Sequence, residues 1–168
     1  SKSPQGNYNP RTALITGSTD GIGLRTAIDM AESGYRIFVH GRNRTRINAA
    51  AERIRSEVND ALIETFEADF ASMANVVRLA SEVKSRCKTL EVLVNNAGVF
   101  CEQLERTVDG HEMTFQVNVL APFVLTNALL PLMAKAESAR VIMVSAASHA
   151  QAVDWNNLQM EKGFSSYE

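Results

Sequence analysis

Short apolar runs alternate with stretches of helical period along most of this chain, and no linker or low-complexity segment interrupts them. The apolar runs predict buried strands and cover residues 12–16, 35–40, 62–67, 91–95 and 141–145. The periodic stretches predict helices and cover about residues 21–33, 44–59, 73–86 and 110–135. Such alternation is typical of an α/β domain with a doubly wound parallel sheet, whose ligand binds beyond the carboxyl ends of the strands. We therefore expect one such domain over residues 12–168, preceded by a polar segment at residues 1–11.

The predicted helices differ in how much of their surface is apolar. Two of them carry a single apolar stripe that is predicted to face the sheet: Ile47, Ala50, Ala51, Ile54 and Val58 in one, and Val76, Val77, Ala80 and Val83 in the other. Residues 110–135 leave hardly any polar face. A helix of this kind is buried within its domain or against another subunit, and we expect the second, a homo-oligomer. Pro122 and Pro131 predict a kink or an early end of that helix.

Three glycines follow the first predicted strand directly, in the stretch Thr16-Gly17-Ser18-Thr19-Asp20-Gly21-Ile22-Gly23. Glycine suits a turn where the backbone takes positive φ or where a ligand approaches the main chain closely. The helix that follows offers free N–H groups and the positive end of its dipole, so a pyrophosphate fits there. The spacing differs from the Gly-x-Gly-x-x-Gly of the usual dinucleotide fingerprint, so a plain glycine turn stays open as the alternative.

Composition narrows the classes of function. The net charge of −2 gives no basic face for nucleic acid. No apolar run approaches the roughly 18 residues of a membrane span, and residues 1–11 do not look like a signal peptide, so we expect no span and a cytoplasmic location. The two cysteines are expected to be reduced, and no metal site is expected because the histidines are dispersed. These residues are Cys87 and Cys101, and His40, His111 and His149.

Asn95-Asn96-Ala97-Gly98 follows the fourth predicted strand directly. Together with the glycine stretch upstream and Asn118-Val119-Leu120-Ala121-Pro122 downstream, it closely resembles the short-chain dehydrogenase/reductase family over residues 12–168. The resemblance implies a Rossmann-type fold and hydride transfer between a nicotinamide cofactor and an alcohol or carbonyl group. Residues 140–145, His149 and residues 157–162 look like the retinol-dehydrogenase and WW-domain-oxidoreductase branch, whose members act on retinoids, steroids and other apolar carbonyl compounds.

The resemblance implies cofactor contacts at several positions. Asp69 matches the acid that binds the adenine amino group, and Asn95, Ala97 and Gly98 match residues that hold the end of the fourth strand and face the nicotinamide ribose. The full set of expected cofactor-binding residues is Gly17, Ser18, Thr19, Gly21, Ile22, Gly23, Arg42, Asp69, Phe70, Asn95, Ala97, Gly98 and Asn118. Without the resemblance, Asp69 is equally well explained as a turn or helix-cap residue and Asn95 as a turn residue.

Cofactor choice depends on the residues at the end of the second predicted strand. An enzyme that prefers NAD(H) normally has an acid there, which pairs with the ribose hydroxyls and repels a 2′-phosphate. In this chain Gly41 takes that place, and Arg42 follows it with a guanidinium that can bind a phosphate through two hydrogen bonds. We therefore predict NADP(H). The alternative is that Arg42, Arg44 and Arg46 only form a solvated helix start.

The catalytic residues match the family only in part. Asn118 matches the asparagine that holds a proton-relay water, but Ala146 occupies the usual place of the catalytic serine. Ser145 and Ser148 are the hydroxyls nearest to that place in the sequence. The resemblance places the Tyr-x-x-x-Lys pair of the family about two residues beyond Glu168, so Tyr167 is expected to be its neighbour and not the acid.

Three explanations for this mismatch stay open. The chain is a fragment of a longer dehydrogenase, a natural truncation that keeps nucleotide binding, or a non-catalytic NADP(H)-binding module that pairs with a complete subunit. On all three, the sheet is expected to be incomplete at its C-terminal end, and the 168 residues alone are not expected to catalyse the reaction. On the first, the substrate is a small apolar alcohol or carbonyl compound.

Overall fold

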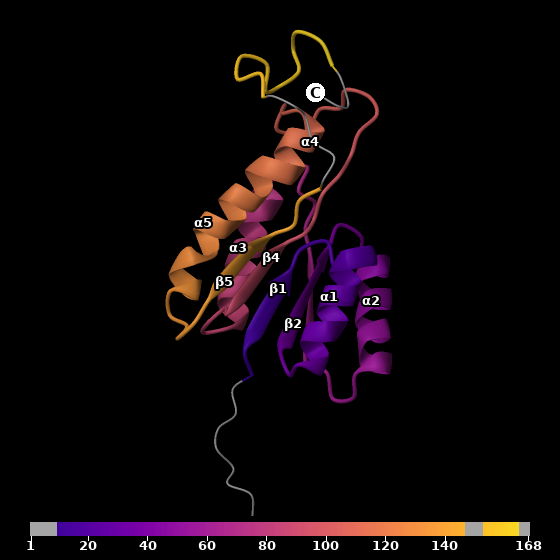
Figure 1. Ribbon diagram of the computed structural model, residues 1–168, viewed down its shortest axis with the longest axis vertical. Coiled ribbons are helices and arrows are strands. Elements are labelled where there is room, and N and C mark those ends of the chain that lie inside the picture. Colours follow the sequence, from indigo (N-terminus) through magenta and orange to yellow (C-terminus); the bar gives the residue numbers. More distant parts are fainter. Residues whose placement is uncertain (1–9, 147–152, 165–168) are drawn as a thin grey trace, which may run out of the picture.

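Residues 10–146 and 153–164 are described by the computed structural model, and they contain five parallel strands between two layers of helices (Figure 1). The strands are β1 (Thr12–Ile15), β2 (Arg36–Gly41), β3 (Ile63–Glu67), β4 (Val92–Asn95) and β5 (Arg140–Met143). The helices are α1 (Gly21–Glu32), α2 (Arg44–Glu57), α3 (Met73–Arg86), α4 (Met113–Phe115), the π-helix η1 (Gln116–Leu120) and α5 (Ala121–Met133). The strand order is β3-β2-β1-β4-β5, so the predicted doubly wound parallel sheet is confirmed.

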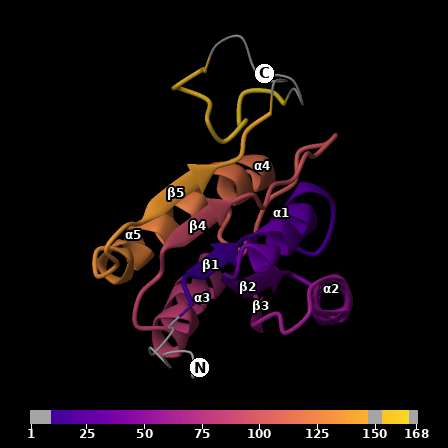
Figure 2. The ribbon, with the colours of Figure 1, turned by 60° about the horizontal axis from the view of Figure 1, so that its bottom comes forward.

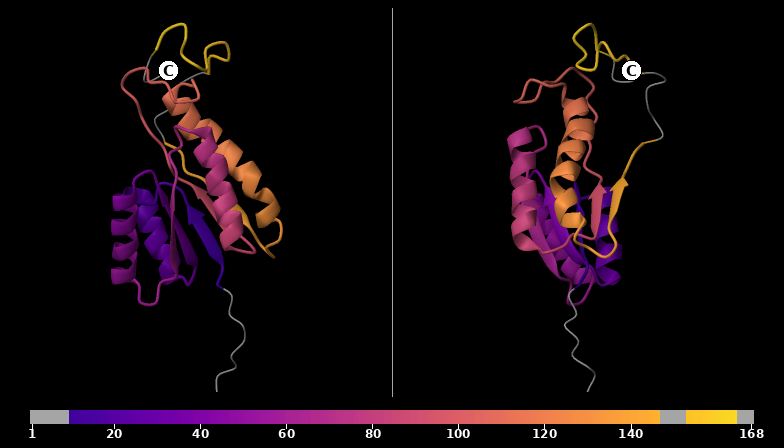
Figure 3. Two further views of the ribbon diagram at one scale, coloured as in Figure 1. Left: turned by 180° about the vertical axis from the view of Figure 1, so that it is seen from behind. Right: turned by 90° about the vertical axis from the view of Figure 1, so that its left-hand side faces the viewer.

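Two apolar cores lie on the two faces of the sheet. Because successive residues of a strand point to opposite faces, Leu14 and Phe38 enter the core that α3 and α5 cover, whereas Ile15 and Val39 enter the core that α1 and α2 cover. Figure 2 and both views of Figure 3 show these two helical layers on either side of the strands. The sheet is therefore buried on both faces through β1 and β2, and every residue of β1 is buried.

The predicted strands agree with the observed ones to within two residues at each end, and α3 has the bounds that were predicted. One residue of the predicted α3 stripe was placed wrongly. Val77 is 54% exposed, and Leu79 packs in the core beside Val76, Ala80 and Val83. The reason is geometric, because residues at i, i+3, i+4 and i+7 share a helix face and the residue at i+1 is turned about 100° away from it.

The stretch 110–135 is helical only from Met113 to Met133, and it contains a π-turn. The N–H of Ala121 donates to the carbonyl of Gln116, five residues back, and Pro122 follows in the first turn of α5. A proline has no N–H to donate, so the first turn tolerates it well. The predicted kink at Pro122 therefore takes the form of a π-turn, whereas Pro131 lies within α5, two residues before its end.

This helical run is apolar on two sides, and only one of them is covered within the described residues. Leu125, Leu129 and Leu132 are buried in the core that faces α3. The outer side carries exposed apolar residues, namely Val119, Phe123 and Leu130. The run from Met113 to Met133 also has the length and mean hydropathy (1.5) of a membrane-crossing helix, so the expectation that no apolar stretch is long enough was wrong. Core helices of globular proteins meet the same criterion, and 39% of the most apolar 18-residue stretch of this run is buried.

Residues 153–164 lie beyond the carboxyl ends of the strands, close to α4 (Figures 1 and 3). The backbone N–H of Glu112 donates to Oε1 of Gln159 over 2.8 Å, which ties this segment to the start of α4. The Glu112 carboxylate accepts from the N–H groups of Thr114 and Phe115 and caps that helix. Three residues considered in the sequence analysis, Ser148, His149 and Tyr167, lie outside the described residues.

Candidate functional site

A cavity of about 380 Å³ opens at the carboxyl ends of β1, β2 and β4, and we call it the main cavity. The chain winds away from β1 in one direction toward β2 and β3 and in the other toward β4 and β5, so this is the switch point of the sheet. The lining residues come from the glycine turn, the end of β2, the connection after β3, the connection after β4 and the α4–η1 region. They are Gly17, Thr19, Asp20, His40, Gly41, Arg42, Asn43, Arg46, Ala68, Asp69, Phe70, Ala71, Asn96, Ala97, Gly98, Val99, Met113 and Val117.

The glycine turn is packed too tightly for side chains at two of its three glycines. Gly17 has φ +62°, and a Cβ added there would lie 2.8 Å from the Cα of Ala97. A Cβ on Gly23 would lie 2.4 Å from the carbonyl oxygen of Gly17. Gly21 also has positive φ, +52°, but a Cβ there would meet nothing within 4 Å, which leaves open space in front of the first turn of α1. Glycine at all three positions is thus explained by packing, by conformation or by both.

Hydrogen bonds join the glycine turn to the connection after β4. The N–H groups of Asn96 and Ala97 donate to Oγ1 of Thr16 over 2.9 and 3.0 Å. The side-chain amide of Asn96 donates to the carbonyls of Thr16 (2.9 Å) and Gly17 (3.0 Å). Asn96 and Thr16 therefore shape the site although neither was in the expected set of cofactor-binding residues. Both stand next to a predicted residue, and only the folded chain shows that they bind each other.

Asn95, which was expected to face the cofactor, points away from the main cavity. Its side chain is buried on the side of the sheet that α5 covers, where Nδ2 donates to Oγ1 of Thr126 over 3.0 Å. Its Oδ1 is buried with no hydrogen-bond partner among the described residues. Alternation along β4 explains this placement, because neighbouring residues of a strand point to opposite faces. Asn95 holds the end of β4, as expected, and Asn96 is the one that faces the glycine turn.

The expected cofactor-binding residues fall into two groups. Those that line the main cavity are Gly17, Thr19, Arg42, Asp69, Phe70, Ala97 and Gly98. Those that do not line it are Ser18, Gly21, Ile22, Gly23, Asn95 and Asn118. Ser18 is fully buried behind the turn, and Ile22 is 68% exposed at the start of α1. The aspartate at position 69 is exposed and accepts from the N–H of Ala71 through Oδ1, so the local turn expected on residue type alone is present as well.

His40 lies at the end of β2 and contacts three segments of the site. It is buried, its Nδ1 accepts from the N–H of Gly17 (3.1 Å), and its Nε2 is 3.0 Å from the carbonyl oxygen of Ala68. Its ring stacks on Phe70 with centroids 4.7 Å apart. Burial lowers the pKa of His40 to about 4, and the nearby Ala68 carbonyl and Asp69 oppose that shift only in part. His40 was expected not to bind a metal, and its contacts to the site were not predicted.

Three arginines follow or face the end of β2, and they differ in their partners. Arg44 donates to Glu67 over 2.8 Å, and Arg46 lies 3.3 Å from Asp20. Within residues 10–146 and 153–164, the Arg42 side chain forms no ion pair or hydrogen bond that would occupy its guanidinium. It follows Gly41, where a Cβ would lie only 2.6 Å from Cγ2 of Thr19, so a larger residue there would require the Thr19 side chain to move. Arg42 is therefore the arginine available to a ligand.

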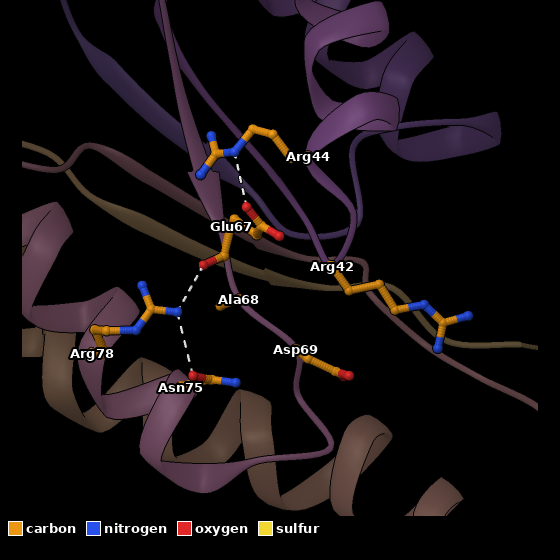
Figure 4. A pocket seen from close by; sticks show the side chains of 7 residues that line it. All are labelled: Arg42, Arg44, Glu67, Ala68, Asp69, Asn75 and Arg78. Carbon is orange, nitrogen blue, oxygen red and sulfur yellow. Dashed lines mark hydrogen bonds and ion pairs between the residues drawn. The ribbon is translucent and has the colours of Figure 1, made fainter.

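A second cavity, of about 200 Å³, lies beside Arg42, and we call it the arginine cavity (Figure 4). Arg42, Arg44 and Arg78 line it together with Glu67, Ala68, Asp69 and Asn75. In Figure 4, Arg44 points to Glu67, whereas Arg78 donates to the carbonyl of Glu67 (3.0 Å) and to Oδ1 of Asn75 (3.3 Å). Two of the three guanidinium groups are thus held by the protein, and Arg42, together with Asp69, borders both cavities.

The catalytic candidates within the described residues, Asn118 and Ser145, do not line the main cavity. Asn118 is in η1, where its Oδ1 accepts from the N–H of Val99 and its Nδ2 donates to the carbonyl of Val99, both over 2.8 Å. Ser145 is exposed, two residues beyond the end of β5, and Ala146 follows it. Asn118 therefore fixes the backbone of the connection after β4, which also lines the main cavity. Within the described residues, no group of three or more His, Cys, Asp or Glu side chains is placed to hold a metal ion.

The short chain dehydrogenase family matches residues 11–158 of this chain. Polyprenol dehydrogenase of Homo sapiens is 35% identical over 162 residues, which cover 94% of this chain and 49% of that protein. Retinol dehydrogenase 14 of Mus musculus is 33% identical over 170 residues, covering 95% of this chain and 51% of that protein. A metagenomic short-chain oxidoreductase crystallised in complex with NADP superposes with a TM-score of 0.73 at 25% identity, over 85% of this chain and 65% of that one. The chain spans about half the length of the two curated relatives.

Proposed function

This chain belongs to the short-chain dehydrogenase family of oxidoreductases, in its retinol dehydrogenase-like branch, and on that premise we propose that it binds NADP(H) in the main cavity. The observation that carries the proposal is the coincidence of three features: the switch point of the sheet, the tightly packed glycine turn and the open space in front of Gly21. The N–H of Gly21 is bound to Oδ1 of Asp20 over 2.8 Å, so a phosphate at the start of α1 would be favoured by the N–H groups of Ile22 and Gly23 and by the helix dipole. The residues present therefore fit a dinucleotide.

The proposed preference for NADP(H) over NAD(H) depends on Arg42. No acid occupies the end of β2, where Gly41 is buried, and Arg42 borders the main cavity and the arginine cavity at once. A 2′-phosphate carries a charge that this guanidinium can neutralise, and a hydrogen bond to a charged group contributes roughly 1.5–3 kcal/mol. The bound cofactor would supply the hydride, and the structural neighbour crystallised with NADP supports this choice of nucleotide.

The proposed reaction is hydride transfer between the nicotinamide and an alcohol or carbonyl group of an apolar small molecule. The names of the relatives support this substrate class, since they are a polyprenol dehydrogenase and a retinol dehydrogenase. In the described residues Asn118 orders the cavity wall through Val99, and Ser145 lies two residues beyond the end of β5. The alternative is a module that binds NADP(H) without turnover.

Titration of NADPH and NADH against the chain and two arginine variants tests the proposal. We expect Arg42→Ala to weaken NADPH binding about tenfold and NADH binding less than about twofold, because only NADPH carries the 2′-phosphate. Arg55→Ala removes the same charge from the far end of α2 and is expected to leave both affinities unchanged. Equal losses for both nucleotides would contradict the role of Arg42, and absence of binding would contradict the function.

Oxidation of NADPH with retinal by the protein purified from its natural source then separates the enzyme from the binding module, because the 168 residues alone are not expected to catalyse the reaction. Consumption of NADPH supports the oxidoreductase, and tight binding without consumption supports the module.

We also propose that the exposed residues on the outer side of η1 and α5, Val119, Phe123 and Leu130, form a homo-oligomer contact, because they share one face of the helical run. Sedimentation of Phe123→Asp as a smaller species than the unmodified chain would support that contact, and an unchanged species would contradict it.

A further inference from the structure

The imidazole of His40 connects the glycine turn to the connection after β3. The backbone N–H of Gly17 is a donor only, so the Nδ1 that it contacts must be the unprotonated nitrogen. The carbonyl of Ala68 is an acceptor only, so the Nε2 that it contacts must carry the hydrogen. Both contacts are satisfied by a single species, the neutral ring with its hydrogen on Nε2. The ring is thus held in one tautomer and one orientation.

The backbone of His40 holds the same turn a second time. The N–H of Ser18 donates to the carbonyl of His40 over 2.9 Å, and the N–H of His40 donates to Oγ of Ser18 over 3.0 Å. Ser18 and His40 are both buried, so these bonds are not exposed to competing water. The side chain of His40 adds a further hydrogen bond to the turn, which it accepts from the N–H of Gly17, where the backbone adopts φ +62°. As a result, Gly17 and Ser18 are both held by hydrogen bonds to the end of β2.

We propose that His40 is a positioning residue for the dinucleotide, which acts by holding the glycine turn through Gly17. This role depends on the nucleotide-binding function proposed above. The N–H of Gly17 is used within the protein, so His40 does not need to touch the ligand. Its effect is to fix where the turn leads into α1, where the N–H groups of Ile22 and Gly23 are the donors left for a phosphate once Asp20 has bound the N–H of Gly21. A turn without this contact would have to be ordered by the nucleotide at a cost in affinity.

The competing explanation is that His40 only fills space beside Phe70, on which its ring stacks. The two explanations differ in which half of the ring matters. A packing role depends on the shape of the ring and treats its two nitrogens alike. A positioning role depends on Nδ1, because only that atom contacts the glycine turn. The two explanations can be separated by two variants, one that keeps only the hydrogen bond to Gly17 and one that keeps only the hydrogen bond to Ala68.

Asparagine and glutamine provide such a matched pair. In His40→Asn the amide oxygen takes the place of Nδ1 and can accept from Gly17, but the contact to Ala68 is lost. In His40→Gln the amide nitrogen takes the place of Nε2 and can donate to Ala68, but the contact to Gly17 is lost. Each variant loses the stacked ring and one hydrogen bond, so we expect similar decreases in the urea midpoint. His40→Leu loses both hydrogen bonds, so its NADPH affinity and urea midpoint show the effect of losing the two together.

NADPH titration and amide hydrogen exchange are measured on the full chain. We expect NADPH affinity within about threefold of the unmodified chain for His40→Asn and about tenfold weaker for His40→Gln, which corresponds to one hydrogen bond to the turn. The amide of Gly17 is expected to exchange at least about tenfold faster in His40→Gln than in His40→Asn. Equal affinities and equal exchange in the two variants would overturn the positioning role.

The readouts separate the two proposals. If the unmodified chain binds NADPH and the Asn and Gln variants do not differ, only the role of His40 is overturned. If the unmodified chain binds neither NADPH nor NADH, the proposed function fails, and the nucleotide-positioning role fails with it. Exchange at Gly17 then still reports whether the imidazole holds the turn, because that measurement needs no nucleotide.

Discussion

The strands β1 and β2, which α1 and α2 cover on one face, contrast with β5 in how much of their surface is buried. All four residues of β1 are buried, as are five of the six in β2, whereas all four residues of β5 are exposed. Both regions belong to one parallel sheet and are rich in apolar residues. The difference is that helices cover both faces at β1 and β2, while Ile142 on the α1–α2 side of β5 stays 44% exposed within the described part of the chain.

This contrast extends to the functional site. The nucleotide side is held by bonds that cross between segments, from Asn96 to Thr16 and from His40 to Gly17. On the catalytic side, Asn118 is bound to the backbone of Val99, but Ser145 is exposed beyond the end of β5. The part of the site around the glycine turn is therefore held in place by hydrogen bonds between residues that the structure describes, whereas Ser145 has no such support from a covered strand.

Truncation of one core residue in each region should give the largest difference. Leu14→Ala leaves a cavity in the core between the sheet and α3, and we expect it to lower the free energy of unfolding by about 4 kcal/mol. Ile142→Ala removes a half-exposed side chain from β5, and we expect a loss below about 1 kcal/mol. Urea unfolding of both variants measures this. Equal losses would show that β5 is as well covered as β1.

A methyl group at Gly17 should be the next most disruptive change. Gly17→Ala combines the cost of positive φ with a contact to the Ala97 backbone at 2.8 Å, and we expect a loss of about 3 kcal/mol in the free energy of unfolding. Gly21→Ala is the matched control, because it has positive φ but no neighbour within 4 Å, and we expect about 1 kcal/mol. If urea midpoints of the two variants coincide, packing against the connection after β4 does not constrain the turn.

The pH dependence of stability should identify the contribution of His40. The pKa of His40 is about 4 in the folded chain and 6.5 ordinarily, so below pH 6.5 the unfolded chain binds a proton that the folded chain does not. Folding therefore loses stability as pH falls from 6.5 toward 4, by about 2 kcal/mol at pH 5. Above pH 6.5 the histidine has no effect on the slope.

His40→Asn provides the comparison for that measurement. It has no imidazole to titrate, so its free energy of unfolding should fall less steeply than that of the unmodified chain between pH 6.5 and 4. Other groups, such as Asp109, whose pKa is lowered by hydrogen bonds from Met73 and Gln116, titrate in both proteins and cancel in the difference. Parallel curves for the two proteins would mean that His40 is protonated in the folded state as readily as in the unfolded one.

Local sequence patterns were sufficient for the secondary structure. The short apolar runs, the period of 3.6 residues and the glycine turn predicted the strands to within two residues and the start of α1 at Gly21. The same patterns failed at Val77, because a run of two valines does not show which one lies at the centre of the buried stripe. They also failed to predict the π-turn before Pro122, since a proline indicates that a helix is disturbed but not how.

The sequence by itself determined the type of fold and the position of the glycine turn, and it led to the proposal that Arg42 binds a phosphate. Each of these follows from residues close together in the chain, where spacing alone fixes the geometry. Tertiary structure decided that Asn96 and not Asn95 joins the turn, that His40 supports it, and that Arg44 and Arg46 are paired while Arg42 is available. These are contacts between segments that are 20 to 80 residues apart, and their partners are known only when the strands have been placed side by side.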